Sequence, residues 1–106
     1  MIDTLKFVED QKVIFVVRTS DPADAEAIIN AAVEGGIRVI EITSFVPQAN
    51  KIIEGLSKKS NLVVGYGSAI DGEQAHRAIQ AGAQYVSSLY FDKNLLTVCK
   101  NNEVPV

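Results

Sequence analysis

The sequence alternates four times between a short apolar run and an amphipathic helical segment. The apolar runs are residues 13–17, 37–43, 62–65 and 85–87. They are rich in β-branched residues and lack an internal proline, which is typical of strands buried on both faces. A strand that is repeatedly followed by a helix predicts a parallel sheet with right-handed crossovers.

Capping residues and glycines mark the expected helix ends. Asp3 or Thr4 begins a short N-terminal helix that carries Ile2, Leu5 and Val8 on one face. The later helices are expected to begin at Thr19, Ser20 or Asp21, at Pro47, at Asp71 and at Asp92; two of them end at the Gly35-Gly36 pair and at Gly82. Residues 104–106 resemble the start of a fifth strand.

The chain length limits how this pattern can close. A (β/α)₈ barrel needs about 250 residues, whereas this chain has 106. We therefore predict a single α/β domain over residues 1–106, the (βα)₄ half of a TIM-type (β/α)₈ barrel with a short N-terminal helix. The pattern leaves open whether the strands curve as a half-barrel or flatten into an open sheet with helices on both faces.

Charge and composition exclude several classes of protein. The net charge of −3 and the pI of about 5.0 provide no broad basic surface for nucleic acid or an anionic membrane. No run approaches the ~18 apolar residues of a membrane span, and acidic residues near Met1 argue against a signal peptide. With Cys99 as the one cysteine and one histidine, we expect no disulfide, metal or cofactor, and a cytoplasmic location.

Ligands of parallel sheets bind at the carboxyl ends of the strands, where Glu41 stands out. A carboxylate within the apolar run 37–43 is costly unless it is paired or functional. Arg18 follows the neighbouring run and could reach it across one strand spacing of about 5 Å. One interpretation is a buried Arg18–Glu41 ion pair without a chemical role. The other is a carboxylate for proton transfer whose pKa is set by burial against Arg18.

A glycine-containing segment, Gly65-Tyr66-Gly67-Ser68, follows the third run. Its glycines could expose backbone N–H groups to an anion ahead of the helix capped by Asp71. They could equally serve only a tight turn between strand and helix.

Together these segments resemble the 2-keto-3-deoxy-6-phosphogluconate (KDPG) / 4-hydroxy-2-oxoglutarate (KHG) aldolases. Residues 13–18 are similar to the first strand of that family with its substrate-site arginine, and residues 34–43 to its second strand. Residues 64–68 and 81–88 are similar to its Gly-Ala-Gly-Thr segment and fourth strand. The resemblance runs from Val13 to Val106 and covers the N-terminal half of the family's barrel.

The resemblance implies roles for individual residues. Glu41 would be the acid/base residue, and the site for a small 2-keto acid or a phosphorylated sugar acid would be lined by Arg18, Thr43, Gly67, Ser68 and Ser88. Where many members carry an arginine two residues after the threonine, this chain has Phe45. The family's Schiff-base lysine lies on a later strand, and none of the seven lysines here is expected in a desolvated pocket.

Two functions remain open at this point. The chain could be an aldolase-related carbon–carbon lyase that acts on or binds a 2-keto acid such as pyruvate. It could instead be a non-catalytic half-barrel that binds a small anionic metabolite or a partner protein. In both cases an exposed inner face that includes Ile14, Val16 and Val39 predicts self-association, with two copies completing an eight-stranded ring as one arrangement.

Overall fold

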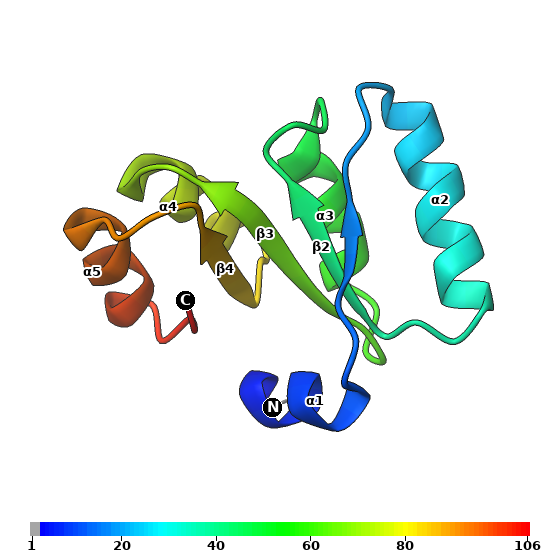
Figure 1. Cartoon of the computed structure of the whole chain (residues 1–106), viewed down its shortest axis with the longest axis horizontal. Helices are drawn as coiled ribbons and strands as arrows, with labels where there is room; N and C mark the ends of the chain where they lie inside the picture. Colours follow the sequence, from blue (N-terminus) through cyan, green and yellow to red (C-terminus); the bar gives the residue numbers. More distant parts are fainter. Residues whose placement is uncertain (1–2) are drawn as a thin grey trace.

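Four parallel strands lie side by side in the order β1-β2-β3-β4, with helices following each of them (Figure 1). The structure is a computed structural model and describes residues 3–106. The strands are β1 (Phe15–Val17), β2 (Val39–Thr43), β3 (Val63–Ala69) and β4 (Tyr85–Ser88). The helices are α1 (Thr4–Gln11), α2 (Pro22–Glu34), α3 (Ala49–Ser57), α4 (Gly72–Ala81) and α5 (Lys93–Asn101).

The strand order explains why the sheet is half of a barrel. Each strand pairs with the one before it, so every right-handed crossover places its helix on the same side of the sheet. The main core accordingly joins alternate strand residues such as Ile40, Ile42 and Val64 to buried residues of α2, α3, α4 and α5. The open sheet with helices on both faces would need a reversal of strand order, and none is present in the sheet as described. The predicted α/β half-barrel is confirmed.

Among residues 3–106, the opposite, inner face of the sheet is covered only at one end, where α1 lies across the amino ends of the strands (Figure 1). Phe7 and Val8 of α1 pack there on Val39, Val63 and Tyr85. The prediction that Val39 belongs to an exposed inner face is therefore wrong, because this helix buries it completely.

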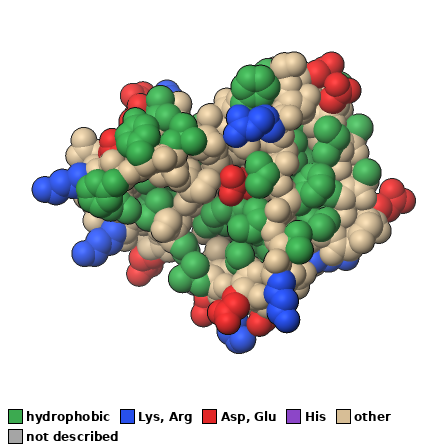
Figure 2. Space-filling model, viewed as in Figure 1, with side chains coloured by type: hydrophobic (Ala, Val, Ile, Leu, Met, Phe, Trp, Pro, Cys, Tyr) green, Lys and Arg blue, Asp and Glu red, His purple; other side chains and the backbone are tan. Residues whose placement is uncertain are grey.

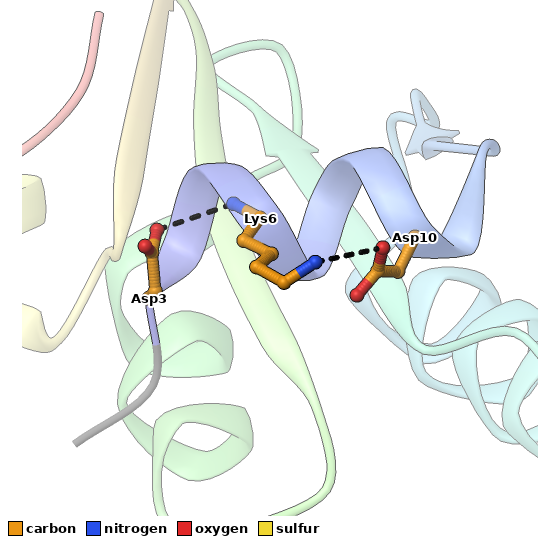
Figure 3. Close-up of polar contacts among 3 residues, drawn as sticks. All are labelled: Asp3, Lys6 and Asp10. Atoms are coloured by element: carbon orange, nitrogen blue, oxygen red, sulfur yellow. Dashed lines mark hydrogen bonds and ion pairs between the residues drawn. The ribbon is translucent and has the colours of Figure 1, made fainter.

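Helix α1 begins as its sequence predicts. The Asp3 side chain accepts a hydrogen bond from the backbone N–H of Lys6 at 3.2 Å, and the Lys6 ammonium lies 3.5 Å from the Asp10 carboxylate (Figure 3). Asp3 rather than Thr4 is the cap. This ion pair is solvent-exposed and contributes at most about 0.5 kcal/mol. Of the three apolar residues expected on one helix face, Ile2 lies outside the described residues, Leu5 is exposed and Val8 faces the sheet.

Aspartates cap three of the later helices, as the sequence indicates. Asp21, Asp71 and Asp92 each accept a backbone N–H bond in the first turn of the following helix, at 2.8 Å in every case. At the other end of α4, Gly82 adopts the left-handed conformation, with φ of 113°, that ends a helix readily.

Several element boundaries differ from the prediction. Strands β1 and β2 begin two residues later than expected, and α3 begins at Ala49 rather than near Pro47. Strand β3 continues to Ala69 instead of ending at Gly65. Residues 104–106 are not part of a strand, although the backbone N–H of Val86 donates to the Pro105 carbonyl at 3.0 Å.

Candidate functional site

Glu41 lies on the inner face of β2, where only 8% of its surface remains exposed. Both of its carboxylate oxygens accept a hydrogen bond. The Tyr85 hydroxyl donates to Oε1 at 3.1 Å, and the Ser87 hydroxyl donates to Oε2 at 3.1 Å. Two hydroxyl donors therefore compensate part of the cost of burying this carboxylate.

These donors come from β4, two strands away from Glu41. Strand β3 runs between them, and Gly65 is in register with both Glu41 and Tyr85. A Cβ at Gly65 would overlap the Tyr85 ring, and a Cβ at Gly67 would overlap the Glu41 carboxylate. Beyond Val63, the two glycines thus leave the inner face of β3 without side chains, so that groups on β2 and β4 meet above it.

The interpretation of these glycines as a tight turn is wrong, because both lie within β3. In the structure, the two glycines leave the space that the Tyr85 ring and the Glu41 carboxylate occupy. The irregular backbone comes later, at Ser68, where φ is 38° and the register of β3 and β4 shifts. Whether backbone N–H groups of this segment bind an anion stays a prediction.

Tyr85 is held in its protonated form. Burial, and then the charge and hydrogen bond of Glu41, raise the pKa of the Tyr85 phenol well above its ordinary value. The phenol is therefore a hydrogen-bond donor at all physiological pH values, and it cannot compete with Glu41 as a base.

Arg18 does not pair with Glu41. Its side chain is exposed, and its guanidinium carbon lies 5.9 Å from the centre of the Phe45 ring. Ion pairs among the described residues join Lys6 to Asp10 and Arg77 to Glu73. The predicted buried Arg18–Glu41 pair is absent from the structure as described, and the guanidinium instead takes a cation–π position over Phe45 at the carboxyl edge of the sheet.

Thr43, Ser68 and Ser88 take part in hydrogen bonds that involve backbone carbonyls. Thr43 is fully buried and donates to the Val17 carbonyl at 2.9 Å, which fixes the end of β1 just before Arg18. The Ser68 carbonyl accepts a bond from the Ser44 hydroxyl at 3.3 Å. The Ser88 hydroxyl lies within hydrogen-bonding distance of the carbonyls of Ala69, at 3.2 Å, and Tyr90, at 2.6 Å.

The structure therefore brings Glu41 and Gly67 into contact and distributes the other four predicted residues along the same edge of the sheet. Two concavities of the described residues lie elsewhere. One of about 610 Å³ lies between α2 and α3, and one of about 380 Å³ lies near the amino ends of the strands. Neither is lined by a predicted site residue. Figure 2 shows the inner side instead as an open surface on which hydrophobic side chains gather around a small acidic patch.

Tyr85 and Ser87 are not among the residues to which the family resemblance assigns a role. The Tyr85 ring packs with Val39 and Val63, whereas its hydroxyl bonds to Glu41. A signal was available, because residues 85 and 87 alternate onto one face of the fourth strand and the two glycines of the third remove any barrier.

Within residues 3–106 there is neither a buried lysine nor a cluster of metal-ligating side chains. All seven lysines are exposed in the structure. Within residues 3–106 there is no group of three histidine, cysteine or acidic side chains that could hold a metal ion. Over the same residues, no helix combines the length and apolar character that crossing a membrane requires.

Comparison with known proteins identifies relatives of this chain. Its sequence is 32% identical over 107 residues to a 2-dehydro-3-deoxy-phosphogluconate aldolase of Treponema pallidum, an alignment that covers 100% of this chain and 51% of that protein. A second such aldolase, from Zymomonas mobilis, is 34% identical over 68 residues, or 64% of this chain and 33% of that protein. The chain thus spans about half the length of the curated relative that it matches throughout.

Solved structures agree with these relatives. A KDPG aldolase from Legionella pneumophila, with pyruvate captured as a covalent carbinolamine intermediate, superposes with a TM-score of 0.75 and 31% identity over 87% of this chain and 45% of that one. A KDPG aldolase of Zymomonas mobilis with 3-phosphoglycerate superposes with a TM-score of 0.82 and 26% identity over 96% of this chain and 49% of that one. The sequence model of the KDPG and KHG aldolases matches residues 4–106. The chain belongs to the KDPG and KHG aldolase family.

Proposed function

We propose that this chain is an aldolase-family half-barrel that binds a 2-keto acid such as pyruvate at the carboxyl ends of its strands, with Glu41 transferring a proton there. The observation that carries the proposal is the buried Glu41 carboxylate, which two neutral hydroxyl donors hold on an otherwise apolar inner face. A carboxylate so placed is a general base within a low-dielectric site. The captured pyruvate of the Legionella pneumophila relative supports the ligand class.

The other site residues then have distinct tasks. Arg18 is the cation at this edge that can hold the carboxylate of a 2-keto acid, and Thr43 fixes the strand end that carries it. Gly67 leaves the space in front of Glu41. Ser68 and Ser88 supply polar groups at the rim, where a phosphorylated sugar acid would extend beyond the keto acid.

The chemistry assigned to this chain is proton transfer and not Schiff-base formation, because every lysine is exposed. The Glu41 carboxylate takes a proton from the methyl carbon of pyruvate. The C–H electron pair becomes the new C=C bond, and the carbonyl oxygen receives the negative charge. Return of a solvent proton from Glu41 to the same carbon completes the cycle without consuming pyruvate.

Deuterium exchange tests this function directly. In D₂O we expect the chain to replace the methyl protons of pyruvate faster than buffer does, and we expect Glu41→Gln to lose the acceleration, which for one general base is about 10²-fold or more. Arg18→Ala should weaken pyruvate binding measured by calorimetry. Arg77→Ala removes another exposed arginine, on α4, and is the matched control. Exchange no faster than in Glu41→Gln would contradict the proposal.

Borohydride treatment separates this chemistry from a lysine mechanism. With pyruvate and borohydride, intact-mass analysis should show the unmodified chain mass, since no lysine is desolvated. A reduced covalent adduct would instead demonstrate a reactive lysine and overturn this part of the assignment.

The second candidate function is a non-catalytic half-barrel that self-associates. It is favoured by the exposure of Val16, at 50%, on the inner face of β1 and of Ile14, at 43%, just before that strand. The lack of a partner strand beyond β1 within the described residues favours it as well. Two copies that close an eight-stranded ring would cover both features. Sedimentation velocity at micromolar concentration should reveal a dimer. A monomer that does not bind a hydrophobic dye would contradict self-association. The cytoplasmic location stays a prediction.

A further inference from the structure

The two hydrogen bonds to Glu41 differ from ordinary compensation of a buried charge because they fix the whole carboxylate group. Each oxygen has its own donor, one from Tyr85 and one from Ser87. Because both donors lie on the same strand, two residues apart, together they fix the orientation of the carboxylate plane. A glutamate side chain otherwise has rotamer freedom, which must be lost before it can act at one place.

The Tyr85 side chain is held rigidly by its surroundings. Its ring packs on Val39 and Val63, and Phe7 and Val8 of α1 close the same small core. Only the hydroxyl extends from this core to Glu41. The position of the Tyr85 oxygen is therefore set by apolar packing at the amino end of the strands, independently of any ligand.

We propose that Tyr85 and Ser87 are positioning residues that hold the Glu41 carboxylate in the orientation from which it exchanges a proton with a 2-keto acid. This inference rests on the proposed function, because it assigns Glu41 the role of base. It goes beyond that function in naming the two side chains on which the rate of proton transfer depends. Neither side chain needs to touch the ligand.

The proposal predicts opposite effects for two kinds of variant. Tyr85→Phe and Ser87→Ala each remove one donor and should each lower the exchange rate at saturating pyruvate by about tenfold, the equivalent of one hydrogen bond to a charged group. Pyruvate affinity should stay within about twofold, since a charge-assisted contact to Arg18 is untouched. Arg18→Ala should show the reverse pattern, with weaker binding as its main effect.

Two further variants separate positioning from general damage to the fold. Ser87→Thr keeps a hydroxyl at the same place and should restore most of the rate lost in Ser87→Ala. Tyr90→Phe removes a tyrosine hydroxyl that bonds to the Ile70 carbonyl in a loop, and it should exchange pyruvate protons at the wild-type rate. Circular dichroism at the assay temperature confirms that each variant is folded.

A spectroscopic measurement checks the hydrogen bond without any ligand. With ¹³Cζ-labelled tyrosine in a mixture of H₂O and D₂O, a buried and bonded hydroxyl exchanges slowly and gives two resolved Cζ signals. We expect this splitting for Tyr85 in the wild-type chain and its loss in Glu41→Ala. A single, averaged Tyr85 signal in the wild-type chain would overturn the positioning role.

The kinetic outcomes distinguish the two proposals. A wild-type chain that does not accelerate exchange overturns the proposed function. A wild-type chain that does accelerate it, with Tyr85→Phe and Ser87→Ala equally fast, leaves the proposed function intact and overturns the positioning role alone. Lower exchange rates in both Tyr85→Phe and Ser87→Ala, with unchanged pyruvate affinity, support the positioning role.

Discussion

Replacing Gly65 with alanine tests whether the glycines of β3 exist to let β2 and β4 meet. The new methyl group would overlap the Cζ, Cε1 and Cε2 atoms of the Tyr85 ring. That ring cannot move aside freely, because it packs in the small core with Val39 and Val63. The backbone is no obstacle, since Gly65 lies in β3 outside the left-handed region.

Three contributions determine how much Gly65→Ala changes the free energy of unfolding. Overpacking of a filled core costs about 1–3 kcal/mol. Displacement of the Tyr85 ring also breaks its bond to the Glu41 carboxylate, worth about 1.5–3 kcal/mol. Alanine offsets about 0.4–1 kcal/mol of this loss of stability, because it reduces the conformational entropy of the unfolded chain. We therefore expect Gly65→Ala to lower the free energy of unfolding by about 2–4 kcal/mol, which for a domain of this size lowers Tm by roughly 10–20 °C.

Urea titrations of four proteins at one concentration measure this effect. Tyr85→Leu shortens the side chain so that the three overlapping ring atoms are gone, and Gly65→Ala should cost under about 1 kcal/mol in that background. The wild-type chain and the two single variants complete the cycle. Gly55→Ala is the matched control, because its methyl group would meet no atom within 4 Å in the middle of α3, and it should stabilise the chain by about 0.5–1 kcal/mol.

Equal costs of Gly65→Ala in the two backgrounds would refute the reasoning. The coupling between positions 65 and 85 would then be zero, and the glycine would have to be explained by its own backbone. A cost below about 1.5 kcal/mol in the wild-type background would refute it as well, since that is the least that the three contributions together allow.

Four other predictions follow from the described contacts. Thr43→Val removes a buried donor to the Val17 carbonyl and should cost about 1–3 kcal/mol in a urea titration, while an unchanged midpoint would contradict this. Burial raises the pKa of the Cys99 thiol, so a thiol reagent at mildly alkaline pH should react only as fast as the chain opens, and an immediate reaction would show an exposed thiolate. The folded chain keeps the Tyr85 proton above the ordinary phenol pKa of 10.0, whereas the unfolded chain loses it there. Stability should therefore be insensitive to this group below pH 10 and fall above it, and Tyr85→Phe should show a shallower alkaline decline. Val16→Asp places a charge on the exposed inner face of β1, and sedimentation should show loss of any dimer.

The starts of three later helices could be predicted because local chemistry decides them. Asp21, Asp71 and Asp92 cap helices in the structure as their position in the sequence indicates. The extent of β3 could not be predicted in this way. Glycine is usually a turn signal, and here Gly65 and Gly67 lie in a strand because the neighbouring strands need their inner face empty. That requirement exists only in the folded sheet.

The site shows the same division between local and non-local information. Glu41 could be singled out because a carboxylate in an apolar run demands compensation, wherever it comes from. Strand spacing alone predicts Arg18, the nearest basic residue in the predicted sheet, as its partner. The compensation instead comes from two neutral hydroxyls on β4, 44 and 46 residues further along the chain. An exposed guanidinium keeps its hydration at the edge of the sheet, whereas bringing it beside Glu41 would have required burying a second charge.

The uneven covering of the inner face has a consequence for assembly. At the amino ends of the strands α1 already buries Val39 and Val63, so this end has no need of a partner. Towards the carboxyl ends, Glu41 keeps 8% exposure while Val16 of the neighbouring strand is 50% exposed. Any second half that completes the ring must therefore cover β1 without closing the way to Glu41. A complete barrel meets both conditions, because it covers its inner side chains with those of the facing strands and leaves the carboxyl end open to ligands. On this reasoning Val16→Asp should abolish association and leave the Tyr85–Glu41 hydrogen bond in place, since that bond depends only on packing within one copy.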